Sequence, residues 1–172
     1  YSMFSSATNR DETLGEALTK RYPQFTTLHA ELQQLRTEYR QYKKEHGLMD
    51  FDDLLERTLE LLNENDDVRH QVASRCRHVL VDEYQDTNAL QAELVKKFSS
   101  VHGNVTVVGD DAQSIYKFRG ADFRNIFRFP DQFEDTEVLK LERNYRSTQP
   151  ILDLANRVIG QADRSYDKTL FT

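Results

Sequence analysis

The sequence lacks the features that mark several large classes of protein. Its 172 residues include a single cysteine, Cys76, which excludes an internal disulfide and fits a reducing compartment. The five histidines do not have the spacing to cysteine that is typical of metal sites. No stretch is long and apolar enough to cross a membrane, and no secretory signal pattern is present at the start. These absences predict a cytoplasmic protein without membrane contact, in which Cys76 is a small buried helix residue.

The chain also has no excess of positive charge. It contains 23 Lys and Arg against 29 Asp and Glu, which gives a formal net charge of −6. A protein that binds DNA through charge alone is basic, so any contact with nucleic acid must be local here. With 38% hydrophobic and 30% charged residues, the composition is that of a globular protein. The length predicts one domain with a sizeable core, or one domain with pieces of others.

Helical periodicity is strongest in the first third of the chain. From Phe25 to His46 the apolar positions alternate steps of three and four, which predicts a helix that ends at Gly47. We expect this helix to pack against its neighbours in the chain, and a short coiled coil is the alternative. Asp50 is predicted to cap the next helix. The expected buried stripe of that helix consists of Phe51, Leu54, Leu55, Leu59 and Leu62.

Weaker patterns occupy the two ends of the chain. Residues 1–21 are polar and have little periodicity, which predicts a loop or a truncated edge. A further helix is expected to begin at Asp66 and Asp67. Beyond residue 110 the patterns predict short helices at 114–118 and 123–127, the second stopped before Pro130, a strand at 137–141, and a last helix from Thr148 to Gly160.

A short apolar run at residues 79–81 is followed at once by two acids. The run is too short for a helix and is typical of a strand buried on both faces of a parallel sheet. Asp82 and Glu83 would then lie at the edge of the sheet where open α/β folds bind ligands. One acid there can hold the magnesium of a nucleotide, and the other can orient or deprotonate water. The same pattern also occurs where a strand simply emerges into solvent.

A second apolar run at residues 105–108 ends at Gly109 and Asp110. The segment between the two runs predicts a helix that Thr87 or Asn88 caps. Strand, helix and strand with a short return form a βαβ unit, whose two strands are parallel. Both acidic ends are therefore predicted to lie at the same edge of the sheet.

Three blocks of sequence carry a resemblance to a known family. HVLVDEYQDTN (78–88), VTVVGDDAQSIYKFRGA (105–121) and LERNYRS (141–147) resemble, in this order, motifs II, III and IV of superfamily 1 DNA helicases of the UvrD/Rep/PcrA type. The resemblance implies an α/β fold. It consists of a partial RecA-like P-loop NTPase domain with parallel strands and flanking helices, plus an N-terminal helical segment from an inserted subdomain.

The resemblance also implies a division of the chain. Residues 1–47 would end the inserted helical subdomain (1B-like), 48–141 would form the C-terminal half of the first RecA-like ATPase domain (1A-like), and 142–172 would start the second (2A-like). None of the six glycines begins a G-x-x-x-x-G-K-[ST] loop, whose N–H groups and lysine hold the phosphates of ATP. We therefore expect an interior part of a larger helicase, with no appreciable ATP hydrolysis by this chain alone.

Each motif residue receives a role from the resemblance. Asp82 would bind Mg²⁺, and Glu83 would be the catalytic base that polarises the water attacking the phosphate of ATP. Gln113 matches the glutamine that contacts the γ-phosphate. Arg146 matches the arginine that reaches the γ-phosphate from the second motor domain, and Tyr145 matches the tyrosine that stacks on the adenine. The first four are the expected catalytic residues, and all five are expected to bind the nucleotide.

The segment after Gln113 implies contact with DNA. Tyr116 and Phe118 match aromatic residues that stack on bases of single-stranded DNA, and Arg119 lines the same track. Phe118 stands where many relatives have tryptophan, which reduces the stacking area, and core packing is the alternative for Phe118 alone. Gln85 and Asp86 receive no separate role, since helix capping or hydrogen bonding in the core explains them.

The function implied is that of an ATP-dependent DNA helicase or translocase in DNA repair or replication. It would couple Mg-ATP hydrolysis to 3′ to 5′ movement on single-stranded DNA and at duplex junctions, with the rest of the helicase chain as a partner. Two alternatives stay open: a degenerate helicase fold that binds DNA or a protein, and a piece of a RecB/AddA-type helicase–nuclease. The intact acidic pair, with Gln113 and Arg146, argues against decay.

Overall fold

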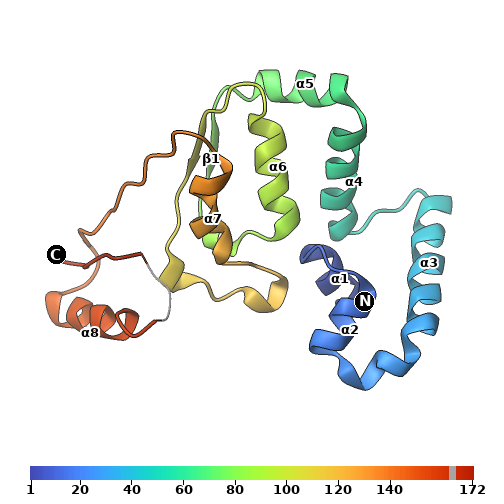
Figure 1. Ribbon diagram of the computed structural model, residues 1–172, viewed down its shortest axis with the longest axis horizontal. Helices are drawn as coiled ribbons and strands as arrows, with labels where there is room; N and C mark the ends of the chain where they lie inside the picture. Colours follow the sequence, from blue (N-terminus) through green and yellow to red (C-terminus); the bar gives the residue numbers. More distant parts are fainter. Residues whose placement is uncertain (163–165) are drawn as a thin grey trace.

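The computed structural model describes residues 1–162 and 166–172, and only the backbone of Arg119. The chain is mostly helical and has one small parallel sheet, which confirms the α/β class in its general form (Figure 1). Its α-helices are α1 Ser2–Asn9, α2 Leu14–Arg21, α3 His29–Glu45, α4 Phe51–Glu64, α5 Asp66–Arg75, α6 Ala89–Ser99, α7 Arg124–Gln132 and α8 Gln149–Ile159. The strands are β1 Val79–Val81 and β2 Val105–Val107, and the short 3₁₀ turns are η1 Pro23–Leu28, η2 Tyr84–Asp86, η3 Asp111–Gln113 and η4 Lys117–Arg119.

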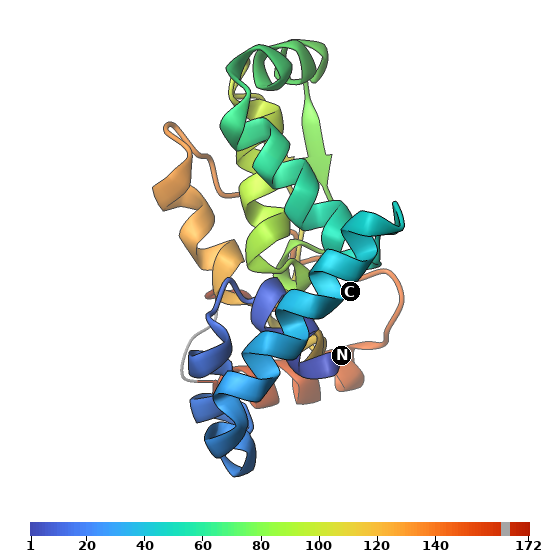
Figure 2. The ribbon, with the colours of Figure 1, turned by 90° about the vertical axis from the view of Figure 1, so that its right-hand side faces the viewer.

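The two strands pair in parallel, as predicted. Val79 pairs with Val105 and Val81 with Val107, and α6 forms the connection between the strands. Asn88 caps α6 by accepting a hydrogen bond from the Gln91 N–H (2.8 Å). Helix α5 lies across the ends of α4 and α6 (Figures 1 and 2). The predicted βαβ unit is therefore present and well capped.

Within residues 1–162 and 166–172, side chains cover the sheet on one face only. Its inward valines pack on a cluster that consists of Tyr84, Val95, Ile126 and Phe129, from η2, α6 and α7. Leu80, in the middle of β1, is 77% exposed. The prediction of a strand buried on both faces is wrong for this structure, because α6 and α7 both lie on the same side. No third strand forms at residues 137–141 either, and Leu139 and Leu141 there are exposed.

The prediction of a loop at residues 1–21 is wrong. This stretch forms α1 and α2, and the second helix begins with a capping box in which the Thr13 hydroxyl accepts from the Glu16 N–H (3.2 Å). Ala7, Ala17 and Leu18 are buried between these helices and their neighbours. Helices of eight residues are too short to display a clear period, but the T-x-x-E spacing was a readable signal of a helix start.

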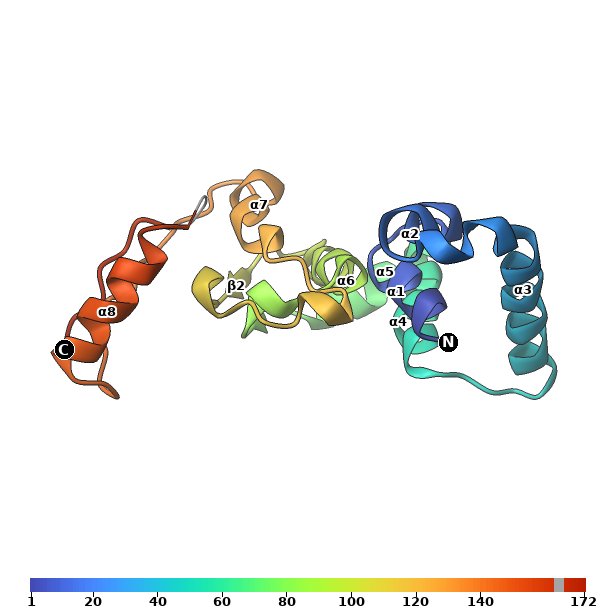
Figure 3. The same cartoon turned by 90° about the horizontal axis from the view of Figure 1, so that it is seen from below.

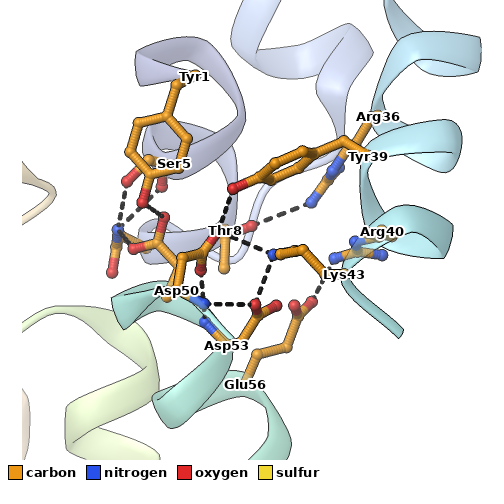
Figure 4. Close-up of polar contacts among 12 residues, drawn as sticks. Tyr1, Ser5, Thr8, Arg36, Tyr39, Arg40, Lys43, Asp50, Asp53 and Glu56 are labelled. Atoms are coloured by element: carbon orange, nitrogen blue, oxygen red, sulfur yellow. Dashed lines mark hydrogen bonds and ion pairs between the residues drawn. The ribbon is translucent and has the colours of Figure 1, made fainter. Parts of the chain in front are cut away.

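Helix α3 contacts its neighbours mainly through polar groups, rather than through the predicted apolar packing. Leu35 and Tyr42 are more than half exposed. Lys43 instead lies between Asp50 (2.8 Å) and Asp53 (2.5 Å) at the start of α4 (Figure 4). Burial alone would lower the pKa of Lys43, but its hydrogen bonds to the two carboxylates raise it. The expected cap at Asp50 is confirmed. The same carboxylate forms an ion pair with Lys43, which holds α3 against the start of α4.

The same polar cluster reaches α1. The Tyr39 hydroxyl donates to Asp50 (3.0 Å), Arg40 pairs with Glu56 (2.6 Å), and the guanidinium of Arg36 donates to the Thr8 hydroxyl (3.0 Å), as Figure 4 shows. The predicted stripe of α4 is only partly buried: Leu62 is buried, whereas Phe51 and Leu54 are exposed. The polar contacts explain why the stripe is only partly buried. Helix α3 contacts the start of α4 through ion pairs, and not through the apolar side chains of the stripe.

The C-terminal third departs further from the predicted elements. Residues 114–116 are not helical and separate η3 from η4. Helix α7 contains Pro130 instead of stopping before it. A proline has no N–H, so the Ile126 carbonyl cannot receive its usual bond from residue 130, and the Tyr166 hydroxyl donates to it instead (3.1 Å). Cys76 follows α5 and is half-buried, not a buried helix residue.

Helix α8 forms where it was predicted. Thr148 precedes it, Pro150 lies in its first turn, and Gly160 follows its last residue. It lies apart from the other helices, at one end of an elongated molecule (Figures 1 and 3). Within the described ranges, no helix has both the length and the apolar composition needed to cross a membrane.

Candidate functional site

The acidic ends of β1 and β2 meet at one edge of the sheet. Backbone pairing continues past both strands, since the Val108 N–H donates to the Val81 carbonyl (2.8 Å) and the Tyr84 N–H donates to the Val108 carbonyl (2.9 Å). Asp82 and Glu83 therefore leave β1 beside the point at which Gly109 and Asp110 leave β2. The sequence prediction that these residues share an edge is confirmed.

Asp82 and Glu83 present their carboxylates to solvent at this edge. Both residues are exposed. Glu83 has left-handed backbone angles (φ 51°, ψ 41°), which a residue with a side chain rarely adopts and which cost about 1–3 kcal/mol. Its N–H donates to Asp82 Oδ1 (2.9 Å). One oxygen of the Asp82 carboxylate is therefore bound within the turn itself.

Gln85 links the two loops of the edge through hydrogen bonds in the core, one of the two explanations that the sequence analysis offered for it. Its side chain is 1% exposed. Nε2 donates to Glu83 Oε2 (2.8 Å), and Oε1 accepts from the Asp110 N–H (3.0 Å). Gly109 makes room for it, because a Cβ at that position would come within 2.6 Å of Gln85 Oε1. The orientation of Glu83 thus depends on a buried amide that also fixes the loop after β2.

Gln113 belongs to the same edge through Asp110. The Asp110 carboxylate caps η3 by accepting from the Ala112 N–H (3.0 Å), and its other oxygen accepts from Gln113 Nε2 (2.7 Å). Gln113 is itself exposed. A primary amide can donate to an anion and accept from water at the same time, so this position suits contact with a polar ligand at the edge.

Lys168 is a second residue whose place the sequence did not reveal. Its ammonium group lies 2.5 Å from Asp110 Oδ1 and 2.7 Å from Asp111 Oδ1. The side chains of Lys168 and Asp111 are 14% and 4% exposed, so this ion pair is largely shielded from water. A lysine 58 residues away from its partner leaves no local pattern in the sequence.

Asp110 is expected to stay ionised to lower pH than an ordinary aspartate. Burial acts to raise its pKa, but hydrogen bonds from Lys168, Gln113 and the Ala112 N–H outweigh burial and hold the pKa below that of an ordinary aspartate. Because the folded-state pKa is the lower one, the ionised carboxylate stabilises the fold above the unfolded pKa, and this is lost as the pH falls through the folded pKa. We expect an NMR titration of the carboxyl carbon to show this depression, and Lys168→Met to raise the value. An unchanged pKa in the variant would contradict it.

Tyr145 and Arg146 are not brought to this edge. Both side chains are exposed, and the Arg143 guanidinium lies over the Tyr145 ring (5.1 Å). The loop is shaped by Asn144, whose side-chain oxygen accepts from the N–H groups of residues 146 and 147 (2.8 and 2.7 Å). Over residues 1–162 and 166–172, no hydrogen bond or ion pair joins the side chain of Tyr145 or Arg146 to the carboxylates of Asp82 and Glu83.

The predicted DNA-contacting aromatics lie on the surface beyond η3. Tyr116 and Phe118 are 39% and 73% exposed, and their ring centroids are 6.1 Å apart. Core packing, the alternative for Phe118, is therefore not what the structure shows. The side chain of Arg119 lies outside the described part of the chain.

A pocket of about 270 Å³ opens next to these aromatics. Its lining includes Arg10, Lys117 and Arg124 together with Glu12 and Asp122. Arg10 donates to the Lys117 carbonyl, and Arg124 pairs with Asp122 (2.7 Å). The three cations are offset by the two acids, so the pocket is polar but only weakly positive.

The donor set limits how a cation could bind at the edge. Among the described side chains, no group of three or more histidines, cysteines or acids could hold a metal ion by itself. Mg²⁺ in nucleotide sites uses one or two carboxylates, with the remaining ligands supplied by phosphates and water. Asp82, an exposed carboxylate at a strand end, fits that arrangement. It does not fit a metal site built from protein ligands alone.

Comparison with known proteins gives a consistent result. Residues 1–134 match the family model of the UvrD/REP helicase N-terminal domain. The chain is 42% identical over 137 residues to DNA helicase II of Rickettsia typhi, covering 78% of this chain and 21% of that protein. It is 44% identical over 134 residues to ATP-dependent DNA helicase Rep of Salmonella typhimurium (78% and 20%), and 44% identical over 133 residues to ATP-dependent DNA helicase srs2 of Schizosaccharomyces pombe (76% and 14%). The chain therefore spans about a fifth of the length of most of these relatives.

Proposed function

The chain belongs to the UvrD/REP helicase N-terminal domain family, and on this basis we propose that it is part of the motor of an ATP-dependent DNA helicase. The observation that carries the proposal is the shared edge of β1 and β2, where Asp82, Glu83 and the Asp110–Gln113 loop lie together. Parallel strands that deliver acids to one edge are the arrangement by which α/β enzymes bind nucleotides. We propose that the α/β unit is the C-terminal half of a RecA-like P-loop NTPase domain.

In this proposal each side chain at the edge has one task. Asp82 holds Mg²⁺, which would neutralise charge on the phosphates of bound ATP. Glu83 accepts a proton from the attacking water, and Gln85 keeps its carboxylate oriented. Gln113 contacts the γ-phosphate through its amide. Backbone N–H groups and a lysine from a glycine-rich loop are needed to hold the phosphates, and this chain does not contain that motif.

Tyr145 and Arg146 act in the proposal from a second motor domain. Their loop would have to approach the edge when a nucleotide binds, with Arg146 placed on the γ-phosphate and Tyr145 on the adenine. The proposed boundaries are residues 1–47 for the end of a helical subdomain, 48–141 for the first motor domain and 142–172 for the start of the second. The exposed loop around Asn144 leaves both side chains available for that approach.

The proposed DNA contact is the aromatic pair Tyr116 and Phe118, with Arg119 beside it. Stacking of a base on such a ring contributes about 1–3 kcal/mol regardless of the base. These residues follow Gln113 within six positions, so a change at the γ-phosphate could be passed directly to the DNA. We propose movement along single-stranded DNA toward duplex junctions in the 3′ to 5′ direction, in repair or replication.

The test compares ATP hydrolysis by this chain and by the longer protein that contains it, each with and without single-stranded DNA. We expect DNA-stimulated turnover in the longer protein and none in this chain, because the phosphate-holding loop is missing from its sequence. Each protein is purified alongside its Glu83→Gln variant, which identifies contaminating ATPases.

Turnover by the chain itself, lost in the variant, would overturn the expectation that it is inactive alone. A longer protein that binds DNA without hydrolysing ATP would favour the degenerate binding module. Degradation of DNA along with unwinding would favour a RecB/AddA-type helicase–nuclease.

A further inference from the structure

The last residues of the chain contact two loops that are distant in sequence. Residues 166–172, here called the 166–172 segment, run from the loop after β2 to the loop that carries Arg146. One end is bound to Asp111, and the other pairs with the backbone around Arg143. No other described segment contacts both loops through hydrogen bonds or ion pairs.

The first contact is the buried ion pair of Lys168. Its ammonium group bonds to Asp110 and Asp111 (2.5 and 2.7 Å), and the Tyr166 N–H donates to Asp111 Oδ2 (3.2 Å). The Tyr166 ring stacks on Phe127 of α7 with the centroids 4.9 Å apart. This end of the segment is therefore bound both to the loop that orients Gln113 and to the apolar core.

The second contact is a backbone ladder with the LERNYRS block. The Asn144 N–H donates to the Phe171 carbonyl (2.6 Å), and the Phe171 N–H donates to the Glu142 carbonyl (3.1 Å). The Glu142 carboxylate also accepts from the Thr169 N–H (2.7 Å). Asn156 of α8 also binds this end of the segment, because its side chain exchanges two hydrogen bonds with the Leu170 backbone (both 2.9 Å).

The 166–172 segment sets an upper limit on the distance between the Lys168 ion pair and the backbone ladder at Phe171. Two residues lie between Lys168 and Phe171. Their Cα atoms are three peptide units apart in the chain, so they are at most about 11 Å apart in space. While the ion pair and the ladder are both intact, this length of chain limits how far the loop before Arg146 can move from the Asp110–Gln113 loop. Breaking the ion pair would leave this end of the segment held, among the described residues, only through Tyr166, by its N–H on Asp111, its hydroxyl on the Ile126 carbonyl and its ring on Phe127.

We propose that Lys168 is a positioning residue that couples the Gln113 loop to the Arg146 loop. This inference rests on the proposed function, since it concerns the approach of Arg146 to a nucleotide at the edge. Asp110 connects Lys168 to Gln113, because its carboxylate binds both the Lys168 ammonium group and the Gln113 amide. Lys168 itself touches neither nucleotide nor DNA in this scheme.

The experiment uses the longer protein and the variants Lys168→Met and Lys168→Arg, with the exposed Lys140→Met as the matched control. We expect Lys168→Met to lower kcat for DNA-stimulated ATP hydrolysis by about 10–100-fold, the scale of a misplaced catalytic group, with a smaller change in KM. Lys168→Arg should recover most of the loss, because it keeps the charge. Lys140→Met should behave as the unaltered protein.

A second readout does not depend on ATP. Hydrogen exchange at the N–H groups of Asn144 and Phe171 should become faster in Lys168→Met, because these groups close the ladder that the ion pair holds in place. Faster exchange with an unchanged kcat would overturn the coupling, and unchanged exchange would overturn the role of Lys168 in holding the segment. An unaltered protein without turnover would instead contradict the proposed function, and this is established before any variant is compared.

Discussion

Glu83→Gln in the longer protein is expected to lower kcat for ATP hydrolysis by about 10²–10⁴-fold, the range that a general base contributes, while ATP still binds. The substitution removes the group that would accept the proton but keeps its size. Gln85 Nε2 now donates to a carboxylate oxygen of Glu83 (2.8 Å), and an amide oxygen at that place can still accept. The left-handed turn at residue 83 and the loop after β2 should therefore be preserved.

The measurement is steady-state turnover over a range of ATP concentrations with saturating single-stranded DNA. Glu134→Gln is the matched control, because it makes the same chemical change at an exposed position beyond α7. Circular dichroism spectra of all three proteins should coincide. A kcat within a factor of two of the unaltered protein would remove Glu83 from the role of base.

Tyr84→Ala is expected to lower the free energy of unfolding by about 3–5 kcal/mol, the usual cost of removing a large aromatic side chain from a core. Tyr84 is 0% exposed and meets Phe129 edge-on, with the ring centroids 5.5 Å apart. It lies between the sheet, α6 and α7 and follows Glu83 directly in the chain, so the cavity would open next to the proposed catalytic base. This is a large share of the 5–15 kcal/mol that stabilises a typical domain.

Tyr84→Phe is the control that separates the ring from its hydroxyl. The hydroxyl is buried and has no hydrogen-bond partner among the described residues, and burial raises its pKa. Removing an unsatisfied buried group should leave stability unchanged or raise it by about 1 kcal/mol. Urea unfolding of this chain, followed by circular dichroism, measures both variants. A loss of more than about 1 kcal/mol in Tyr84→Phe would show that the hydroxyl has a partner.

The elements that were predicted correctly are those that depend on a few consecutive residues of the sequence. The strand at Val79–Val81 was visible as an apolar run, and the caps at Asp50 and Asn88 as short polar residues before helical patterns. The strand expected at residues 137–141 failed for a different reason. A strand needs a partner to pair with, and an apolar run cannot indicate whether one is present.

The candidate site was predictable to the same extent. Asp82, Glu83 and Gln113 converge because each follows a strand of the same parallel pair, and parallel strands share an edge. Hydrogen bonding of Gln85 in the core was one of the explanations considered, but its partners and the whole role of Lys168 were missed, because these contacts depend on how loops fold onto one another. A buried amide and a distant lysine have no spacing that would distinguish them from surface residues.

The separate position of α8 has a consequence for how the chain unfolds. Among its apolar residues Leu152 is buried, but Ile151, Leu154 and Val158 are all more than half exposed. The helix joins the remainder through an extended linker and the 166–172 segment. A helix with so little buried surface opens at a small fraction of the free energy that opens the core. Melting of the chain is therefore not a single cooperative event. A melting temperature describes the sheet with α6 and α7, while α8 will already have lost its structure at temperatures where they remain intact.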